Sequence, residues 1–151
     1  MTPPPDTGPP VTPPRYEDWL AIVEALNRIG ALFDARDWDG LADVILADAT
    51  CYGDTGLPLI IERSLRHNLG GCGPSQHLLG NYQITVDGDT AVSHTKVRAF
   101  HRGAGDRRDR TFETMGTYHD RWVRTAGGWR MTARVFDVDM NIGDISVLQP
   151  G

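Results

Sequence analysis

Two histidines and one aspartate have residue types and positions suited to acid–base chemistry. His77 begins the strand-like run "SQHLLGNY" (residues 75–82), and His101 closes the next such run in "VRAFH". A histidine in a pocket can take a proton from carbon and return it to a leaving hydroxyl near neutral pH. Asp34, in "LFDARDW", lies in the last turn of a predicted helix, where the helix dipole disfavours a carboxylate. The position of Asp34 therefore needs another reason.

Tyrosines and further histidines supply hydrogen-bond donors. Tyr52 and His101 are candidates to stabilise charge that develops on a carbonyl oxygen, and packing explains Tyr52 equally well. Tyr118 is a third candidate, and its alternation with His119 means that only one of the two faces inward. We expect His67 and His94 on the surface. His101 shares a strand face with a small, mostly apolar set that suits a pocket wall: Ala99, Val97 and Thr95.

The elements around these residues follow from hydrophobic periodicity. Residues 16–33 have the apolar spacing of a helix, and a second helix is predicted after the break "DARDWDG", with Asp37 or Asp39 as its cap. A short strand and turn follow, and then a short helix, "IIERSLRHNLGG". Residues 81–101 and 111–140 are typical of two hairpins, which turn at "DGD" and "AGG". Helices followed by an antiparallel meander predict an α+β fold, whose curved sheet would enclose a cavity.

Composition bounds the protein's class and partners. The chain has 151 residues and a formal net charge of −5, which favours one small domain without the basic stripe that nucleic acid or a membrane surface requires. Residues 1–14 are rich in Pro, Thr and Gly, so we expect a disordered tail there and one domain over 15–151. Neither a signal peptide nor a spanning segment is apparent, so we expect a cytoplasmic protein, with Cys51 and Cys72 as thiols. No motif for a metal or nucleotide cofactor is found.

Four segments together resemble a known superfamily: "LFDARDWDGLADVI", "SQHLLG", "VRAFH" and "GGWRM". They are similar to the SnoaL-like branch of the nuclear-transport-factor-2-like (NTF2-like) superfamily and, within it, to the scytalone dehydratases. The likeness covers roughly residues 16–145. It implies a cone-shaped α+β barrel, in which N-terminal helices pack on a strongly curved antiparallel sheet around a deep apolar pocket. It also implies a small-molecule substrate, no cofactor, and a homodimer or homotrimer.

The resemblance assigns roles residue by residue. His77 falls on the family's catalytic histidine, Asp34 on its paired aspartate, and His101 on its second pocket histidine. Tyr52 falls within about one position of a tyrosine that holds a water on the substrate carbonyl. Phe33 stands where the dehydratases have a tyrosine, and Tyr118 where they have a pocket asparagine, which favours a different substrate. The residues expected to contact substrate are Phe33, Tyr118, Val97 and Trp19.

Three functions fit these residues. The first is a cofactor-independent lyase or isomerase that acts on a cyclic, hydroxylated ketone or polyketide-like molecule through an acid/base dyad of His77 and Asp34. The second is a polyketide cyclase or an epoxide hydrolase in the same pocket. A hydrolase would need two aspartates beside an arginine; Arg98 and Arg134 are available, but a second inward aspartate is not identified. The third is a binding module without chemistry.

Overall fold

The computed structural model describes residues 16–151, so the predicted disordered tail at 1–14 lies outside the described residues. In chain order the helical elements are α1 (Tyr16–Ala35), the short η1 (Asp39–Asp43), α2 (Leu57–Leu59), which continues into the π-helical η2 (Ile60–Gly70), η3 (Gly105–Arg107) and η4 (Ile145–Val147). The strands are β1 (Ile45–Cys51), β2 (Asp54–Thr55), β3 (Ser75–Asp87), β4 (Thr90–Arg102), β5 (Thr111–Thr125) and β6 (Gly128–Gly143).

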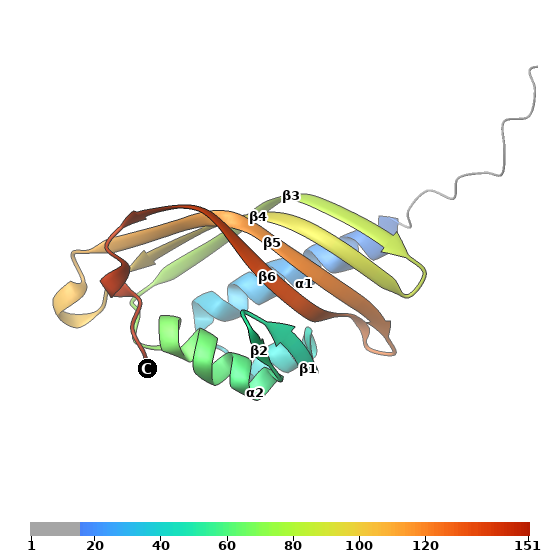
Figure 1. Ribbon diagram of the computed structural model, residues 1–151, viewed down its shortest axis with the longest axis horizontal. Helices are drawn as coiled ribbons and strands as arrows, with labels where there is room; N and C mark the ends of the chain where they lie inside the picture. Colours follow the sequence, from blue (N-terminus) through green and yellow to red (C-terminus); the bar gives the residue numbers. More distant parts are fainter. Residues whose placement is uncertain (1–15) are drawn as a thin grey trace, which may run out of the picture.

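A single curved sheet covers the helices (Figure 1). Its six strands run in the order β2-β1-β6-β5-β4-β3, and the four long strands form an antiparallel meander. The α1 helix packs beneath β3, and α2 and η2 lie below the opposite part of the sheet (Figure 1). The fold is therefore the predicted α+β cone, with one correction: β1 pairs with β6 in parallel, so the sheet is mixed rather than wholly antiparallel.

The long α1 helix buries one apolar stripe against the sheet. Ile22, Leu26 and Ile29 are fully buried there, at the three- and four-residue spacing of one helix face. The helix ends at a left-handed residue, Arg36 (φ 57°), whose N–H donates to the Phe33 carbonyl while the Asp37 N–H donates to the Leu32 carbonyl. This pair of bonds is the usual closure of a helix C-terminus, although glycine normally occupies the left-handed position.

The predicted second helix is wrong beyond one turn. Residues 39–43 form only η1, and Ile45 already begins β1, where Ile45, Ala49 and Cys51 are buried. Asp37 Oδ1 accepts from the Gly40 N–H at 3.0 Å, which accounts for one of the two candidate capping aspartates. Pairing with β6, more than eighty residues later, gives this segment its extended form.

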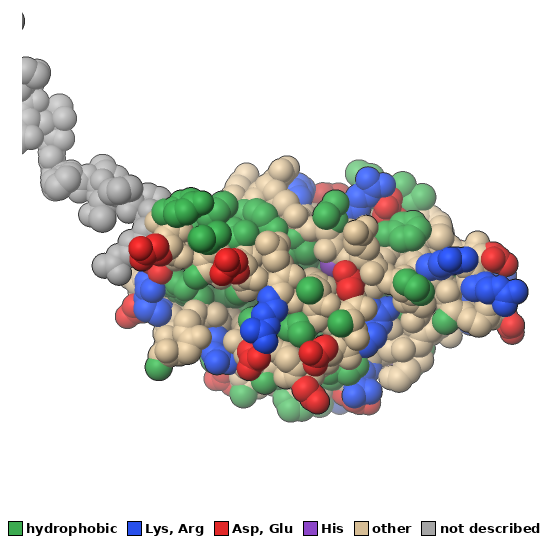
Figure 2. Space-filling model, turned by 180° about the vertical axis from the view of Figure 1, so that it is seen from behind, with side chains coloured by type: hydrophobic (Ala, Val, Ile, Leu, Met, Phe, Trp, Pro, Cys, Tyr) green, Lys and Arg blue, Asp and Glu red, His purple; other side chains and the backbone are tan. Residues whose placement is uncertain are grey.

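Side chains of both charge signs are interspersed on the surface seen from behind (Figure 2). No helix within residues 16–151 is both long enough and apolar enough to cross a membrane. Several large apolar side chains are exposed on the outer face of the sheet, on strands β3, β4 and β6: Leu78, Phe100, Met140 and Ile142. We call this set the apolar outer patch.

Candidate active site

His77 and Asp34 form a hydrogen-bonded pair between β3 and the end of α1. His77 Nδ1 lies 2.7 Å from Asp34 Oδ1, and the His77 backbone N–H donates to Asp34 Oδ2 at 2.9 Å. The side chain of His77 is 6% exposed and that of Asp34 is 26% exposed. A carboxylate that accepts at Nδ1 selects the tautomer with Nδ1 protonated. This tautomer leaves Nε2 of His77 free to accept a proton.

Arg36 stabilises the local backbone around this pair. Its Nη1 donates to the Phe33 carbonyl at 2.6 Å and to Ser75 Oγ at 2.8 Å, while Nε and Nη2 donate to the carbonyls of Leu69 and Gly73. Ser75 Oγ in turn donates to Asp34 Oδ1 at 2.9 Å. The helix end, the end of η2 and the start of β3 are therefore joined through one guanidinium.

These contacts explain why a carboxylate occupies the last turn of α1. Burial acts to raise the pKa of Asp34, but hydrogen bonds from the His77 ring, the His77 N–H and Ser75 outweigh it, so its pKa lies below the ordinary value. Asp34 is therefore ionised at neutral pH. It can orient the imidazole and stabilise the imidazolium that forms when His77 takes a proton.

His101 lies beside His77 on the neighbouring strand β4. The two ring centroids are 5.5 Å apart with an interplanar angle of 87°, and His101 Nδ1 lies 3.2 Å from the Phe112 carbonyl. Burial and the nearby His77 lower the pKa of His101 to about 4. His101 is therefore neutral near pH 7, with Nδ1 donating to the carbonyl and Nε2 available as an acceptor.

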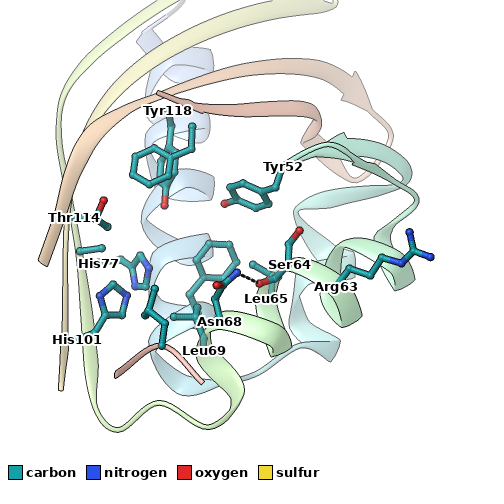
Figure 3. Close-up of a pocket in the computed structure, with 14 residues that line it drawn as sticks. Tyr52, Arg63, Ser64, Leu65, Asn68, Leu69, His77, His101, Thr114 and Tyr118 are labelled. Atoms are coloured by element: carbon teal, nitrogen blue, oxygen red, sulfur yellow. Dashed lines mark hydrogen bonds between the residues drawn. The ribbon is translucent and has the colours of Figure 1, made fainter. Parts of the chain in front are cut away.

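Both imidazoles border a mostly apolar cavity of about 300 Å³ beneath the sheet. His77 and His101 lie next to each other on one side, and Tyr52 approaches from the other (Figure 3). Phe33 packs edge-on against His77 with 5.4 Å between ring centroids. The remaining lining residues come from η2, the sheet and the C-terminal segment: Arg63, Ser64, Leu65, Asn68, Leu69, Ala99, Thr114, Tyr118, Phe136 and Leu148.

Tyr52 and Tyr118 supply the phenols of the cavity. Tyr118 is 4% exposed and faces inward from β5, while His119 faces outward with its Nδ1 2.7 Å from that of His94. Behind Tyr118, Arg134 forms two hydrogen bonds with Asp120, from Nε to Oδ1 at 2.7 Å and from Nη2 to Oδ2 at 2.8 Å. Both side chains of this ion pair are fully buried.

The structure does not bring every predicted substrate contact to the cavity. Val97 is buried against Ala99 and Tyr118 but does not line the cavity. Trp19 lies near the start of α1, stacked on Tyr16 and edge-on to Tyr82, away from the cavity. The only reason to predict that either residue contacts substrate was its position on an apolar face, and residues of the ordinary hydrophobic core lie on such faces too.

Several residues at and around the site were not predicted from the sequence. Ser75 and Arg36 each lie two positions from a member of the His77–Asp34 pair, and that proximity was their only signal. Thr114 and Asp120 share the inward face of β5 with Tyr118, so strand alternation could have found them. Arg98, considered for a hydrolase site, pairs instead with Glu113 and is 63% exposed.

No group of three or more His, Cys, Asp or Glu side chains within residues 16–151 is placed to hold a metal ion. The arrangement nevertheless contains the parts for proton transfer. His77 offers a base, Asp34 orients it, and the phenols of Tyr52 and Tyr118 offer donors across the cavity.

Comparison with known proteins places the chain in a family. The family model of the SnoaL-like domain matches residues 14–135, so the chain belongs to the SnoaL-like family. An uncharacterized protein of Mycobacterium tuberculosis (strain ATCC 25618 / H37Rv), Rv2910c, is 36% identical over 125 residues, covering 78% of this chain and 83% of the relative. This family includes isomerases, dehydratases and polyketide cyclases.

Solved structures show the same fold. A candidate scytalone dehydratase from Novosphingobium aromaticivorans DSM 12444 has a TM-score of 0.77 at 21% identity, covering 89% of this chain and 93% of that chain. An NTF2-like superfamily protein from Salmonella enterica serovar Typhimurium has a TM-score of 0.74 at 19% identity, covering 84% and 94%. These likenesses establish an NTF2-like fold.

Proposed function

We propose that the protein is a cofactor-independent lyase of the dehydratase type, which removes water from a cyclic β-hydroxy ketone. The observation that carries this proposal is the His77–Asp34 pair at the edge of a mostly apolar cavity. A general base that is already oriented and largely sheltered from water suits abstraction of a proton from carbon.

Side chains of the cavity can carry out each proton transfer of this dehydration. His77 Nε2 takes the proton from the carbon next to the carbonyl, and the electron pair moves onto the carbonyl oxygen as an enolate. A hydrogen bond from Tyr52 stabilises that oxygen. The enolate then forms the carbon–carbon double bond as the β-hydroxyl leaves, and the protonated His77 returns its proton to that hydroxyl, which yields an enone and water.

His101 has a separate role in this proposal. Because it is neutral near pH 7, its Nε2 can accept a hydrogen bond from the substrate hydroxyl without competing as a cation for Asp34. It lies next to His77, so it can hold the leaving hydroxyl close to the nitrogen that protonates it. His101 thereby orients the leaving group.

A fused bicyclic ketone tests the proposal. The cavity volume of about 300 Å³ suits one or two six-membered rings, so we choose 3-hydroxy-1-tetralone, whose dehydration gives 1-naphthol. We expect the wild type to form 1-naphthol and His77→Ala to lose at least about 100-fold in kcat. His94→Ala, which changes an exposed histidine on the outer face, is the matched control and keeps full activity.

Activity retained by a folded His77→Ala protein would contradict the proposal.

A cyclase or hydrolase remains the alternative. Dehydration releases substrate oxygen as water, whereas epoxide opening introduces oxygen from labelled solvent into the product. Asp120 does not favour the hydrolase, because it is buried in the ion pair with Arg134 and does not line the cavity. A non-catalytic binding module would release each ligand unchanged.

A further inference from the structure

Two histidines face each other on the outer side of the sheet, away from the cavity. His94 on β4 and His119 on β5 are directly opposite in the antiparallel register of the two strands. Their Nδ1 atoms lie 2.7 Å apart, and the ring centroids are 4.8 Å apart with an interplanar angle of 70°. Neither ring has another hydrogen bond within residues 16–151. The proposed dehydration uses neither of them.

The backbone pairing of β4 and β5 fixes this arrangement before any ligand arrives. The pairing runs without a shift in register from the Thr90–Val123 pair to the Arg102–Thr111 pair. Directly opposite residues on one face have Cβ atoms about 4.5–5.5 Å apart, which brings two imidazoles into contact. One ring is exposed and the other is half-buried, so an ion can reach both from solvent.

The separation of the two nitrogens suits a divalent transition-metal ion. Imidazole nitrogens bind such ions at about 2.0–2.1 Å, which places two of them about 2.9 Å apart at a right angle and about 3.3 Å apart at the tetrahedral angle. The observed 2.7 Å is closer to the right angle, which is typical of Cu²⁺ and Ni²⁺. A small rotation of each ring turns both Nδ1 lone pairs toward one ion, and the proton between the two nitrogens moves to Nε2 of its own ring.

The charged side chains around the pair balance one another. Lys96, two residues further along β4, forms an ion pair with Asp139, with 2.9 Å between Nζ and Oδ2. Arg121 lies two residues further along β5, and Asp137 is exposed on the neighbouring part of β6. Two positive and two negative charges therefore surround the pair, so the imidazoles themselves determine whether a cation binds.

We propose that His94 and His119 form a two-ligand site for a divalent ion of tetragonal preference, Cu²⁺ or Ni²⁺, with water in the remaining coordination positions. No third His, Cys, Asp or Glu within residues 16–151 is placed to complete the site, which leaves it open on the solvent side. An ion held there joins β4 to β5 and stabilises the folded chain. The site is independent of the proposed function, because neither histidine lines the cavity.

Calorimetric titration of the full chain, without a histidine tag, with nickel sulfate tests the site. We expect one Ni²⁺ per wild-type chain. His94→Ala and His119→Ala should each weaken binding at least about tenfold, because only one imidazole remains to hold the ion. His67→Ala is the matched control, since it removes an exposed histidine from η2, and it should keep the wild-type affinity. His77→Ala should keep it too, because the cavity does not hold the ion.

Urea unfolding separates a site of the folded sheet from loose binding to scattered side chains. Excess Ni²⁺ should raise the unfolding midpoint of the wild type and of His67→Ala, but not that of His94→Ala or His119→Ala, since only folding brings the two rings together. The proposal is overturned if the wild type binds Ni²⁺ more weakly than about 1 mM. It is also overturned if folded His94→Ala and His119→Ala proteins keep the wild-type affinity, or if His77→Ala alone loses it.

Discussion

At the residue scale, the hydrogen bonds of Asp34 both stabilise its carboxylate in the helix and orient the imidazole of His77. A negative charge in the last turn of a helix is disfavoured by about 0.3–1 kcal/mol. Three donors offset that cost: Ser75 Oγ, the His77 N–H and the His77 ring. The same contacts that make the carboxylate tolerable also fix the imidazole, so the residue with the least favourable position in α1 organises the site.

Asp34→Asn separates these two roles. Asparagine keeps one acceptor oxygen but loses the negative charge that stabilises the imidazolium, so we expect kcat for 3-hydroxy-1-tetralone to fall about 100-fold. Circular dichroism should still show a folded protein. Asp43→Asn is the control, because Asp43 is exposed and contacts only the exposed Arg28 among the described ion pairs. An Asp34→Asn protein with wild-type kcat would show that the pair is structural.

The buried, neutral His101 predicts acid sensitivity. Its pKa is about 4 in the folded protein and about 6.5 in the unfolded chain, so between these values only the unfolded state takes up the proton. The free energy of unfolding should therefore fall as the pH drops from about 6.5 to about 4, by up to about 3 kcal/mol from this residue. Above pH 6.5 the contribution is constant.

Urea unfolding at pH 7 and pH 5 measures this effect. His101→Gln removes the titrating group, so its stability should change less between the two pH values than that of the wild type. The exposed His67 gives the matched control, His67→Gln, whose free energy of unfolding should change between the two pH values by as much as that of the wild type. An equal change in the free energy of unfolding between pH 7 and pH 5 in all three proteins would show that His101 does not remain neutral on folding.

At the element scale, Arg36 fixes the relative positions of three segments around His77 and Asp34. Its guanidinium bonds to carbonyls at the end of α1, at Leu69 in η2 and at Gly73 before β3. Arg36→Lys cannot span these acceptors with one ammonium, so we expect a loss of about 2 kcal/mol in the free energy of unfolding and faster amide exchange near Gly71. Arg28→Lys, at an exposed ion pair, should change stability by less than about 0.5 kcal/mol. A similar small change for Arg36→Lys would contradict this role.

Local periodicity predicted the elements whose form is decided locally. The α1 stripe and the two long hairpins followed from apolar spacing and from the turns at "DGD" and "AGG". The segment after Trp38 did not follow, since Leu41, Val44 and Ile45 have helical spacing but Ile45 pairs with Met131 across the fold. A parallel strand pair between distant segments leaves no mark in a short window of sequence.

The candidate site, too, could be predicted from the sequence only in part. Asp34, His77 and His101 could be proposed because a resemblance and a polar residue in an apolar setting pointed to them. The Arg134–Asp120 pair was not predicted, because Arg134 lies directly opposite Asp120 only in the register of the β5–β6 pairing, which shifts between Arg121 and Trp122. Trp19 was included for its apolar character, and the structure uses it instead in an aromatic cluster with Tyr16 and Tyr82.

At the scale of the whole molecule, the sheet has two different faces. Its inner face covers the cavity, and its outer face carries the apolar outer patch, in which Leu78 is 61% exposed and Ile142 is 60% exposed. Exposed apolar groups that gather on one face are typical of a contact surface. We therefore propose that the protein forms a homodimer or homotrimer through this face.

Light scattering after size-exclusion chromatography measures the assembly. We expect the mass of two or three chains for the wild type and of one chain for the double variant Met140→Lys, Ile142→Lys, because buried lysines would oppose association. The control Leu20→Lys, Leu59→Lys adds the same charge at exposed leucines of the helices and should keep the assembly. A monomeric wild type would exclude the proposed interface.

The proposed function depends on one step, in which His77, oriented by Asp34, removes a proton from the carbon beside a carbonyl bound in the cavity. The most direct measurement is NMR detection of deuterium exchange into 1-tetralone in heavy water, since this ketone has an acidic α-proton but no leaving hydroxyl. We expect the wild type to accelerate exchange at the α-carbon and the folded His77→Gln variant to leave it at the uncatalysed rate. Exchange at the same rate with both proteins, or at the uncatalysed rate with the wild type, would contradict it.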